Sequence, residues 1–79
     1  MKLLVRNLAR TTTEGEILAL FAAYGAVDEC TLVMDQITGQ SKGFAFVEMP
    51  DQQEAQNALT ALHMSPVAKS KIRVKLSTD

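Results

Sequence analysis

Two phenylalanines, Phe44 and Phe46, stand out because of their spacing within the segment 42–49, which begins with Lys42. In an extended chain successive side chains point to opposite faces, so both rings and the lysine would share one face. Flat aromatic rings can stack on nucleobases, and a cation beside them can contact phosphate. Exposing two such rings to water forgoes roughly 1.5–3 kcal/mol of burial for each. We therefore expect this face to bind something.

Basic residues recur near both ends of the chain, although the formal net charge is only −1. Most of the eight lysines and arginines fall at alternating positions that would share the face of the two phenylalanines: Lys2, Arg6, Lys42, Lys71, Arg73 and Lys75. Among the nine acids we expect only Glu48 clearly on that face. Several of the others fall at the starts of predicted helices, where the helix dipole favours negative charge. The sequence thus predicts a basic sheet face and acidic helix ends.

Four strands and two helices would position these residues. Alternation and β-prone composition predict strands over 2–6, 27–34, 42–49 and 71–76. A capping box of Thr13 and Glu16 should begin the first helix, and Asp51 should cap the second. Each helix carries an apolar stripe. The first comprises Ile17, Leu20, Phe21 and Tyr24, and the second Ala55, Ala58, Leu59 and Leu62.

The order strand, helix, strand, strand, helix, strand predicts an α+β fold of the ferredoxin-like βαββαβ type. Right-handed crossovers place both helices on one face of a four-stranded antiparallel sheet, which leaves the other face open. We expect Ala45, Val47 and Met49 to point toward the helices, and Cys30 to be buried. At 79 residues, the chain is expected to form one domain over 1–79.

Several function classes find no support in the sequence. No apolar stretch approaches the length of a membrane span, and the N-terminus does not read as a signal peptide. The single cysteine cannot form an internal disulfide, and we expect a cytoplasmic monomer. We find no phosphate-binding glycine loop, no Ser/His/Asp set and no His/Cys cluster, so we expect no enzyme, no cofactor and no metal. Because acylphosphatases share this fold, a phosphatase assay would test that expectation.

Two motifs resemble the RNA recognition motif family. Lys42-Gly43-Phe44-Ala45-Phe46-Val47-Glu48-Met49 is similar to the family's octamer motif, and Leu3-Leu4-Val5-Arg6-Asn7-Leu8 is similar to its hexamer motif. They fall in the third and first predicted strands, as the family requires. The resemblance implies binding of single-stranded RNA on the open sheet face. The chain looks most like the small single-domain bacterial members of the family.

The resemblance also implies roles for individual residues. Phe46 would stack on a base, Phe44 would pack against ribose or between nucleotides, and Lys42 would contact phosphate. Leu4 replaces the usual stacking aromatic of the hexamer motif, which implies weak affinity and low sequence selectivity. Arg6 and Arg73 could hydrogen-bond base edges. The expected RNA-binding residues are Lys2, Leu4, Arg6, Lys42, Phe44, Phe46, Lys71, Arg73 and Lys75.

Two alternatives remain open from the sequence. The exposed face could bind a protein partner instead of RNA, as it does in some family members. Single-stranded DNA could also be the ligand, because the contacts to the ribose hydroxyl are not readable from the sequence. His63, at the end of the second predicted helix, is expected to be a cap or surface residue with no functional role.

Overall fold

A computed structural model describes residues 1–77. The elements, in chain order, are β1 (Lys2–Arg6), α1 (Glu14–Ala22), β2 (Glu29–Met34), β3 (Ser41–Glu48), α2 (Gln52–Leu62), β4 (Pro66–Val67), β5 (Ser70–Lys71) and β6 (Arg73–Leu76). Within residues 1–77, no helix is long and apolar enough to cross a membrane.

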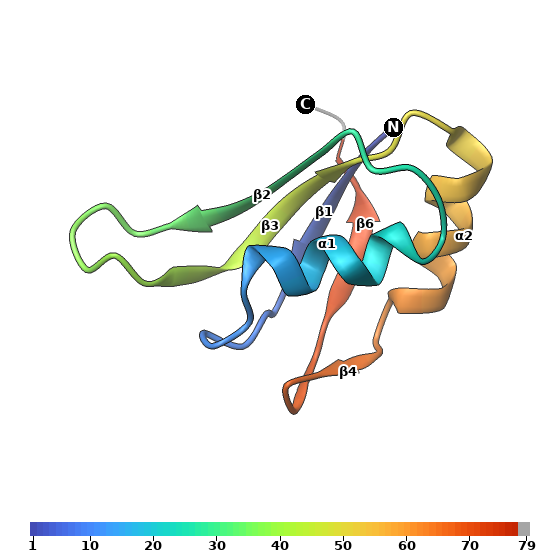
Figure 1. The fold of residues 1–79 in the computed structure, drawn as a ribbon. Coiled ribbons are helices and arrows are strands. Elements are labelled where there is room, and N and C mark those ends of the chain that lie inside the picture. Colours follow the sequence, from blue (N-terminus) through green and yellow to red (C-terminus); the bar gives the residue numbers. More distant parts are fainter. Residues whose placement is uncertain (78–79) are drawn as a thin grey trace.

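The main sheet has four antiparallel strands in the order β2-β3-β1-β6. Both helices lie on the same side of this sheet (Figure 1). The other side of the sheet is open, so the predicted ferredoxin-like α+β fold is confirmed. β4 and β5 pair with each other in a separate small hairpin.

The hydrophobic core lies between the sheet and the helices. Ala45, Val47 and Met49 are fully buried, so the predicted orientation of β3 is confirmed. The helices contribute Ile17 and Phe21 from α1, together with small residues of α2 that permit close packing. Because the core uses one face of each strand, the alternate residues of β1 and β3 are left on the open face.

The predicted helix starts are also confirmed. Thr13 and Glu16 form a capping box, in which the Thr13 hydroxyl accepts from the Glu16 N–H at 3.2 Å. Asp51 caps α2 by accepting from the Glu54 N–H at 2.9 Å. The expectation that Tyr24 belongs to the core is wrong, because α1 ends at Ala22 and the Tyr24 side chain is exposed.

The last predicted strand, 71–76, is interrupted. Lys71 belongs to β5, and Ile72 exchanges backbone hydrogen bonds with the segment 64–65 instead of the main sheet. Only Arg73–Leu76 pairs with β1. Leu76, which alternation places on the same face as Ile72 and Val74, is 45% exposed, and β6 is an edge strand of the sheet. Cys30 is likewise only partly buried, since β2 forms the opposite edge.

Candidate nucleic-acid interface

A row of side chains crosses the open face at the level of Phe46. The register places Leu4 opposite Phe46, Lys75 opposite Leu4, and Thr31 opposite Phe46 on the other side. Directly opposed side chains in antiparallel strands lie about 4.5–5.5 Å apart at Cβ. Leu4 therefore adjoins Phe46 at the centre of the sheet, where a second stacking ring would otherwise stand.

The two phenylalanines form the aromatic part of this face. Their ring centroids are 6.1 Å apart with an interplanar angle of 87°, and both side chains are only half-buried. Lys2 places its Nζ 4.9 Å from the centroid of Phe46, which is a cation–π contact. A base that stacks on that face of Phe46 would have to displace the ammonium group. Lys2 would then be free to contact a phosphate.

Two arginines stand opposite each other beside Phe44. Arg6 of β1 pairs in register with Arg73 of β6, and both are exposed. Like charges directly opposite each other on a sheet are destabilising. An anion between them would offset that repulsion. A depression of about 300 Å³ lined by Arg6, Asn7 and Arg73 provides space for such a group.

A second basic depression of about 300 Å³ lies where β1 ends and β3 begins. Its lining includes Arg6, Arg10, Lys42 and Phe44. Arg10 was not predicted to belong to the site, because it lies in the loop after β1, where strand alternation gives no information. Its closeness in sequence to the hexamer motif is the only feature that could have suggested it.

Tight backbone geometry joins these segments. Asn7 has a φ of 60° and donates from its side-chain amide to the Lys71 carbonyl at 2.8 Å. The Leu8 N–H donates to the Gly43 carbonyl at 2.9 Å, and Gly43 has a φ of 83°. A Cβ at Gly43 would lie 3.3 Å from the Leu8 carbonyl oxygen. These contacts hold the Arg6 end of β1 against the Lys42 end of β3.

The structure brings most of the predicted site residues together on the open face: Lys2, Leu4, Arg6, Phe44, Phe46, Arg73 and Lys75, with Lys42 at the start of β3. Lys71 is the exception. It lies in β5, outside the main sheet, and its backbone carbonyl is used by Asn7. The alternation of 71–76 failed to show this because the pattern continues across the change of hydrogen-bond partner at Ile72.

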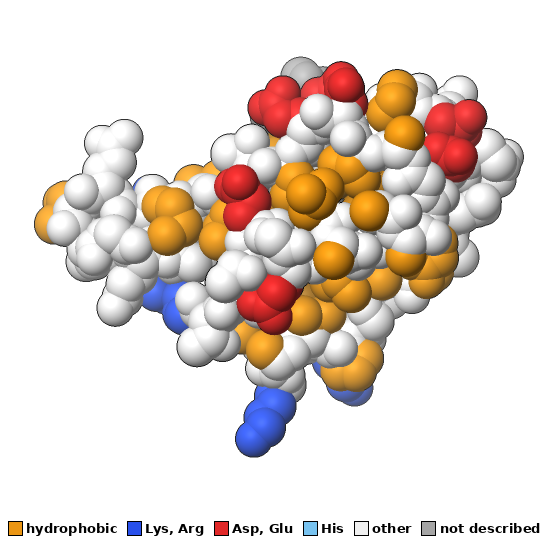
Figure 2. Space-filling view, in the orientation of Figure 1, with side chains coloured by type: hydrophobic (Ala, Val, Ile, Leu, Met, Phe, Trp, Pro, Cys, Tyr) orange, Lys and Arg blue, Asp and Glu red, His pale blue; other side chains and the backbone are white. Residues whose placement is uncertain are grey.

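The charge of the open face changes from acidic at one end of the strands to basic at the other. Glu29 pairs in register with Glu48, which in turn pairs with Lys2, so two carboxylates occupy the end of the face away from Arg6 and Arg73. The prediction that Glu48 is the only acid there is therefore wrong. Red acidic side chains are spread over the helix-covered side in Figure 2, and few blue basic ones appear. An anionic strand would favour the Arg6–Arg73–Lys42 end.

Other titratable groups serve local structure. The backbone N–H groups of Thr38 and Ile37 donate to the Asp35 carboxylate and lower its pKa, which favours the turn before β3. Burial, with help from nearby Glu14, raises the pKa of Cys30 and so disfavours its thiolate. His63 caps α2, as predicted, and its Nδ1 accepts from the Val74 N–H at 3.1 Å. Within residues 1–77, no three His, Cys, Asp or Glu side chains gather as metal ligands would.

The chain is similar in sequence to known RNA-binding proteins and their family. A family model described as RNA recognition motif matches residues 3–73. A Sex-lethal homolog of Chrysomya rufifacies is 39% identical over 61 residues, which is 77% of this chain and 20% of that protein. The chain thus spans about a fifth of the length of that curated relative. Because this organism is not a bacterium, the expected resemblance to bacterial members is not supported.

Two solved structures extend the comparison. The crystal structure of the RNA binding protein PG1 superposes with a TM-score of 0.95 at 34% identity, covering 100% of this chain and 95% of that one. A structure described as a "Sxl-lethal protein/RNA complex" superposes with a TM-score of 0.94 at 31% identity, covering 99% of this chain and 47% of that one. The chain belongs to the RNA recognition motif family.

Proposed function

We propose that the domain formed by residues 1–79 binds single-stranded RNA on the open face of its main sheet. The observation that carries this proposal is the half-exposed Phe44–Phe46 pair beside the Arg6–Arg73 pair. Bases would stack on Phe46, and Phe44 and Leu4 would make apolar or sugar contacts. Phosphates would meet the surrounding cations, including Lys2, Lys42 and Lys75. The family's RNA-bound member supports this assignment.

The proposal extends to the setting of this activity. The domain would act as a monomer in the cytoplasm, without catalysis, in post-transcriptional regulation. Single-stranded DNA would bind on the same rings, because base stacking tolerates either sugar. Comparing matched RNA and DNA pools measures how much the ribose contributes to affinity.

Substitution of Phe46 tests the proposal. Phe46→Ala should weaken binding of a short RNA by about 1–3 kcal/mol, because one stacked base is lost. The fold should persist, because the ring lies outside the core cluster. Fluorescence anisotropy measures affinity, and circular dichroism checks the fold.

Tyr24→Ala is the matched control for this experiment. Tyr24 is also a partly exposed aromatic residue, but it follows α1 and is not part of the sheet. Its substitution should leave the affinity for RNA unchanged. If Phe46→Ala unfolds the domain, or if both variants lose affinity equally, the sheet face is not the binding site.

A protein partner on the same face is the alternative. The feature that favours it is Leu4, an aliphatic side chain at the centre of the face beside Phe46. Leu4 offers contact area to an apolar side chain of another protein but no stacking surface to a base. The response of RNA binding to substitution of Leu4, considered in the Discussion, separates the two proposals.

A further inference from the structure

A groove lies on the helix-covered side of the domain, between α1 and the start of β2. The residues that line it are Glu14, Gly15, Leu18, Val27, Asp28, Glu29 and Cys30. We call it the α1–β2 groove. Its volume is about 220 Å³, which is below the roughly 300–1,000 Å³ of small-molecule sites. A space of this size suits one side chain of a larger partner.

The wall of the α1–β2 groove is apolar. Leu18 of α1 is 42% exposed and is not among the residues that pack against the hydrophobic core. Val27 and Cys30 are half-buried and do pack against that core. Burial, with help from Glu14, raises the pKa of the Cys30 thiol, which therefore stays neutral. An apolar group in the groove would cover all three side chains.

Acidic residues border this apolar wall. Asp28 and Glu14 line the groove, and Glu29 lines it from the edge of the sheet. Glu14 Oε2 accepts from the Leu32 N–H at 2.8 Å, which holds the carboxylate at the edge of β2. Among residues 1–77, no lysine or arginine lines the groove. Figure 2 shows the same distribution more widely, with orange hydrophobic side chains among red acidic ones on the helix-covered side.

Gly15 is a further feature of the groove that the fold does not require. Glycine suits a helix less well than alanine, and Gly15 lies in the first turn of α1. A Cβ there would meet nothing closer than Thr13 Oγ1 at 4.0 Å, so a larger residue would fit. A groove that has to admit a ligand explains why a side chain is missing at this position.

We propose that the α1–β2 groove binds a basic segment of a partner protein, with one apolar side chain of that segment seated against the apolar wall. Lysine or arginine residues on either side of this side chain face Asp28 and Glu14. Charge complementarity carries the choice of partner, because the groove has acidic and apolar lining and no basic lining among residues 1–77. The groove lies on the helix-covered side, so it is separate from the proposed RNA-binding face.

Peptide titration followed by NMR of the backbone amides tests the proposal. Short peptides with a central leucine between lysine pairs are compared with peptides in which serine replaces the leucine or glutamate replaces the lysines. The leucine–lysine peptide should give saturable shifts at Leu18, Val27 and Cys30 and leave Phe46 unchanged. The serine peptide should bind more weakly by on the order of fivefold or more, because burial of one apolar side chain is lost. The glutamate peptide should not bind.

Several results of this titration would overturn the proposal. Equal binding of the leucine and serine peptides would reduce the effect to general charge attraction. Shifts confined to the open face, or no saturable shift at all, would show that the groove is not the site. Shifts at the groove that depend on protein concentration without peptide would show that a second copy of the domain occupies it.

Substitution of Leu18 assigns the binding to the groove. Leu18→Ala should weaken binding of the leucine–lysine peptide by on the order of fivefold, because apolar contact is lost. Leu76→Ala is the matched control, since Leu76 is 45% exposed and lies in β6 at the opposite edge of the sheet. Neither residue belongs to the core cluster, so circular dichroism should be unchanged in both variants. Equal losses of affinity in the two variants would overturn the proposal.

Reversal of one charge tests the choice of partner. Asp28→Lys should weaken binding of the lysine peptide by on the order of threefold to tenfold and allow the glutamate peptide to bind. Gln56→Lys is the control, because Gln56 is exposed in α2 and outside the groove, and it should keep the original preference. An unchanged preference in Asp28→Lys would overturn the proposal.

Gly15→Gln fills the groove without removing any of its walls. The variant should raise the thermal midpoint, because glutamine suits a helix better than glycine. It should also lower the affinity for the leucine–lysine peptide. Unfolding cannot produce this combination, so the result separates a blocked groove from a damaged fold. Unchanged affinity in a folded Gly15→Gln variant would overturn the proposal.

Discussion

Leu4 is the residue at which this domain departs most from the family's stacking surface. It lies opposite Phe46 and is half-buried on the open face. Leu4→Tyr should raise affinity for a short RNA by up to about 1–3 kcal/mol, a factor of roughly 5 to 150, because a ring there can stack on a base. Titration of wild type, Leu4→Tyr and Leu4→Ala against one oligonucleotide measures the effect.

The same series separates the two candidate partners. Leu4→Ala should bind slightly more weakly than wild type, because apolar contact is lost without any loss of stacking. If Leu4→Tyr binds no better than wild type, the protein does not use the family's stacking geometry at this position. An aliphatic contact with a protein partner would then explain Leu4 better.

The buried hydroxyl of Thr12 affects the stability of the fold. A buried hydroxyl without a hydrogen bond costs on the order of 1–3 kcal/mol, and Oγ1 of Thr12 finds no partner among residues 1–77. Thr12→Val should therefore raise the free energy of unfolding by about 1 kcal/mol. Urea denaturation measures the change, and Thr60→Val, at an exposed position of α2, should stay within about 0.5 kcal/mol of wild type. A loss of stability in Thr12→Val would mean that the hydroxyl is satisfied in solution.

At the scale of elements, the contact between β3 and the loop after β1 depends on a glycine. Gly43 has a positive φ, and a Cβ there would press on the Leu8 carbonyl at 3.3 Å. Gly43→Ala should therefore lower the free energy of unfolding by about 1–3 kcal/mol, because the side chain strains the backbone. It should also weaken RNA binding, since Arg6 and Lys42 would be held less firmly.

Gly15→Ala is the matched control for that prediction. Gly15 lies in the first turn of α1, where a Cβ would meet nothing closer than Thr13 Oγ1 at 4.0 Å. Alanine there should raise stability by about 0.5–1 kcal/mol, because it suits a helix better than glycine. Thermal denaturation of both variants compares the two effects. Equal losses would show that the strain is not specific to Gly43.

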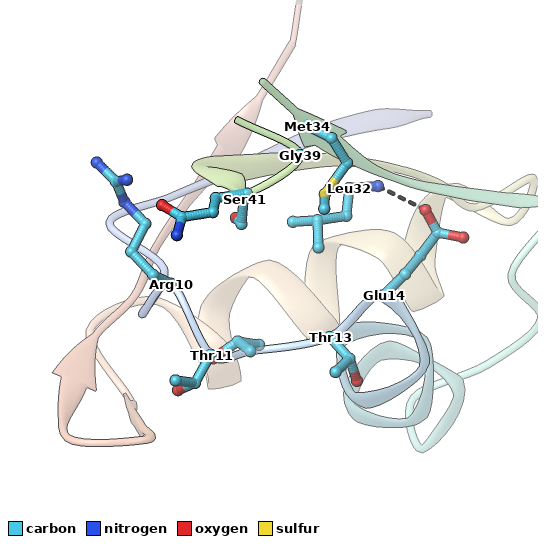
Figure 3. A pocket seen from close by; sticks show the side chains of 10 residues that line it. Arg10, Thr11, Thr13, Glu14, Leu32, Met34, Gly39 and Ser41 are labelled. Carbon is cyan, nitrogen blue, oxygen red and sulfur yellow. Dashed lines mark hydrogen bonds between the residues drawn. The ribbon is translucent and has the colours of Figure 1, made fainter. Parts of the chain in front are cut away.

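The sequence predicted the strands and helices well where apolar residues recur with a period of two or 3.6 residues, because that spacing marks the buried face. Alternation in 42–49 placed Phe44 and Phe46 on the open face because one face of β3 must be fully buried against the helices. The same method misplaced Lys71, since alternation does not record which strand accepts the backbone hydrogen bonds. It also missed Arg10, because a loop has no period. The pocket lined by Arg10, Leu32, Met34 and Ser41 (Figure 3) joins segments far apart in the chain, so no local pattern could reveal it.

At the scale of the whole molecule, the near-neutral net charge conceals an uneven distribution. Arg6, Arg73 and Lys42 border one end of the open face, and Glu29 and Glu48 occupy the other. The carboxylates should keep an RNA strand away from the Glu29–Glu48 end of the face. The net charge of −1 therefore gives no long-range attraction to an anionic strand, while the local charge permits several phosphate contacts at close range.

Salt dependence measures how many phosphates the open face neutralises. For a single strand, each neutralised phosphate adds about −0.7 to the slope of log affinity against log salt. If about three to four cations contact phosphate, the slope should be near −2 to −3 between about 50 and 200 mM salt.

Arg6→Gln should make the slope less steep by about 0.7, the contribution of one contact. Lys69→Gln is the control, because Lys69 lies in the turn between β4 and β5 and outside the open face, so its loss should leave the slope unchanged. Affinity that is indifferent to salt would contradict phosphate binding by this face. Equal effects of the two substitutions would mean that the general charge of the molecule, and not the arrangement at the Arg6 end, attracts the RNA.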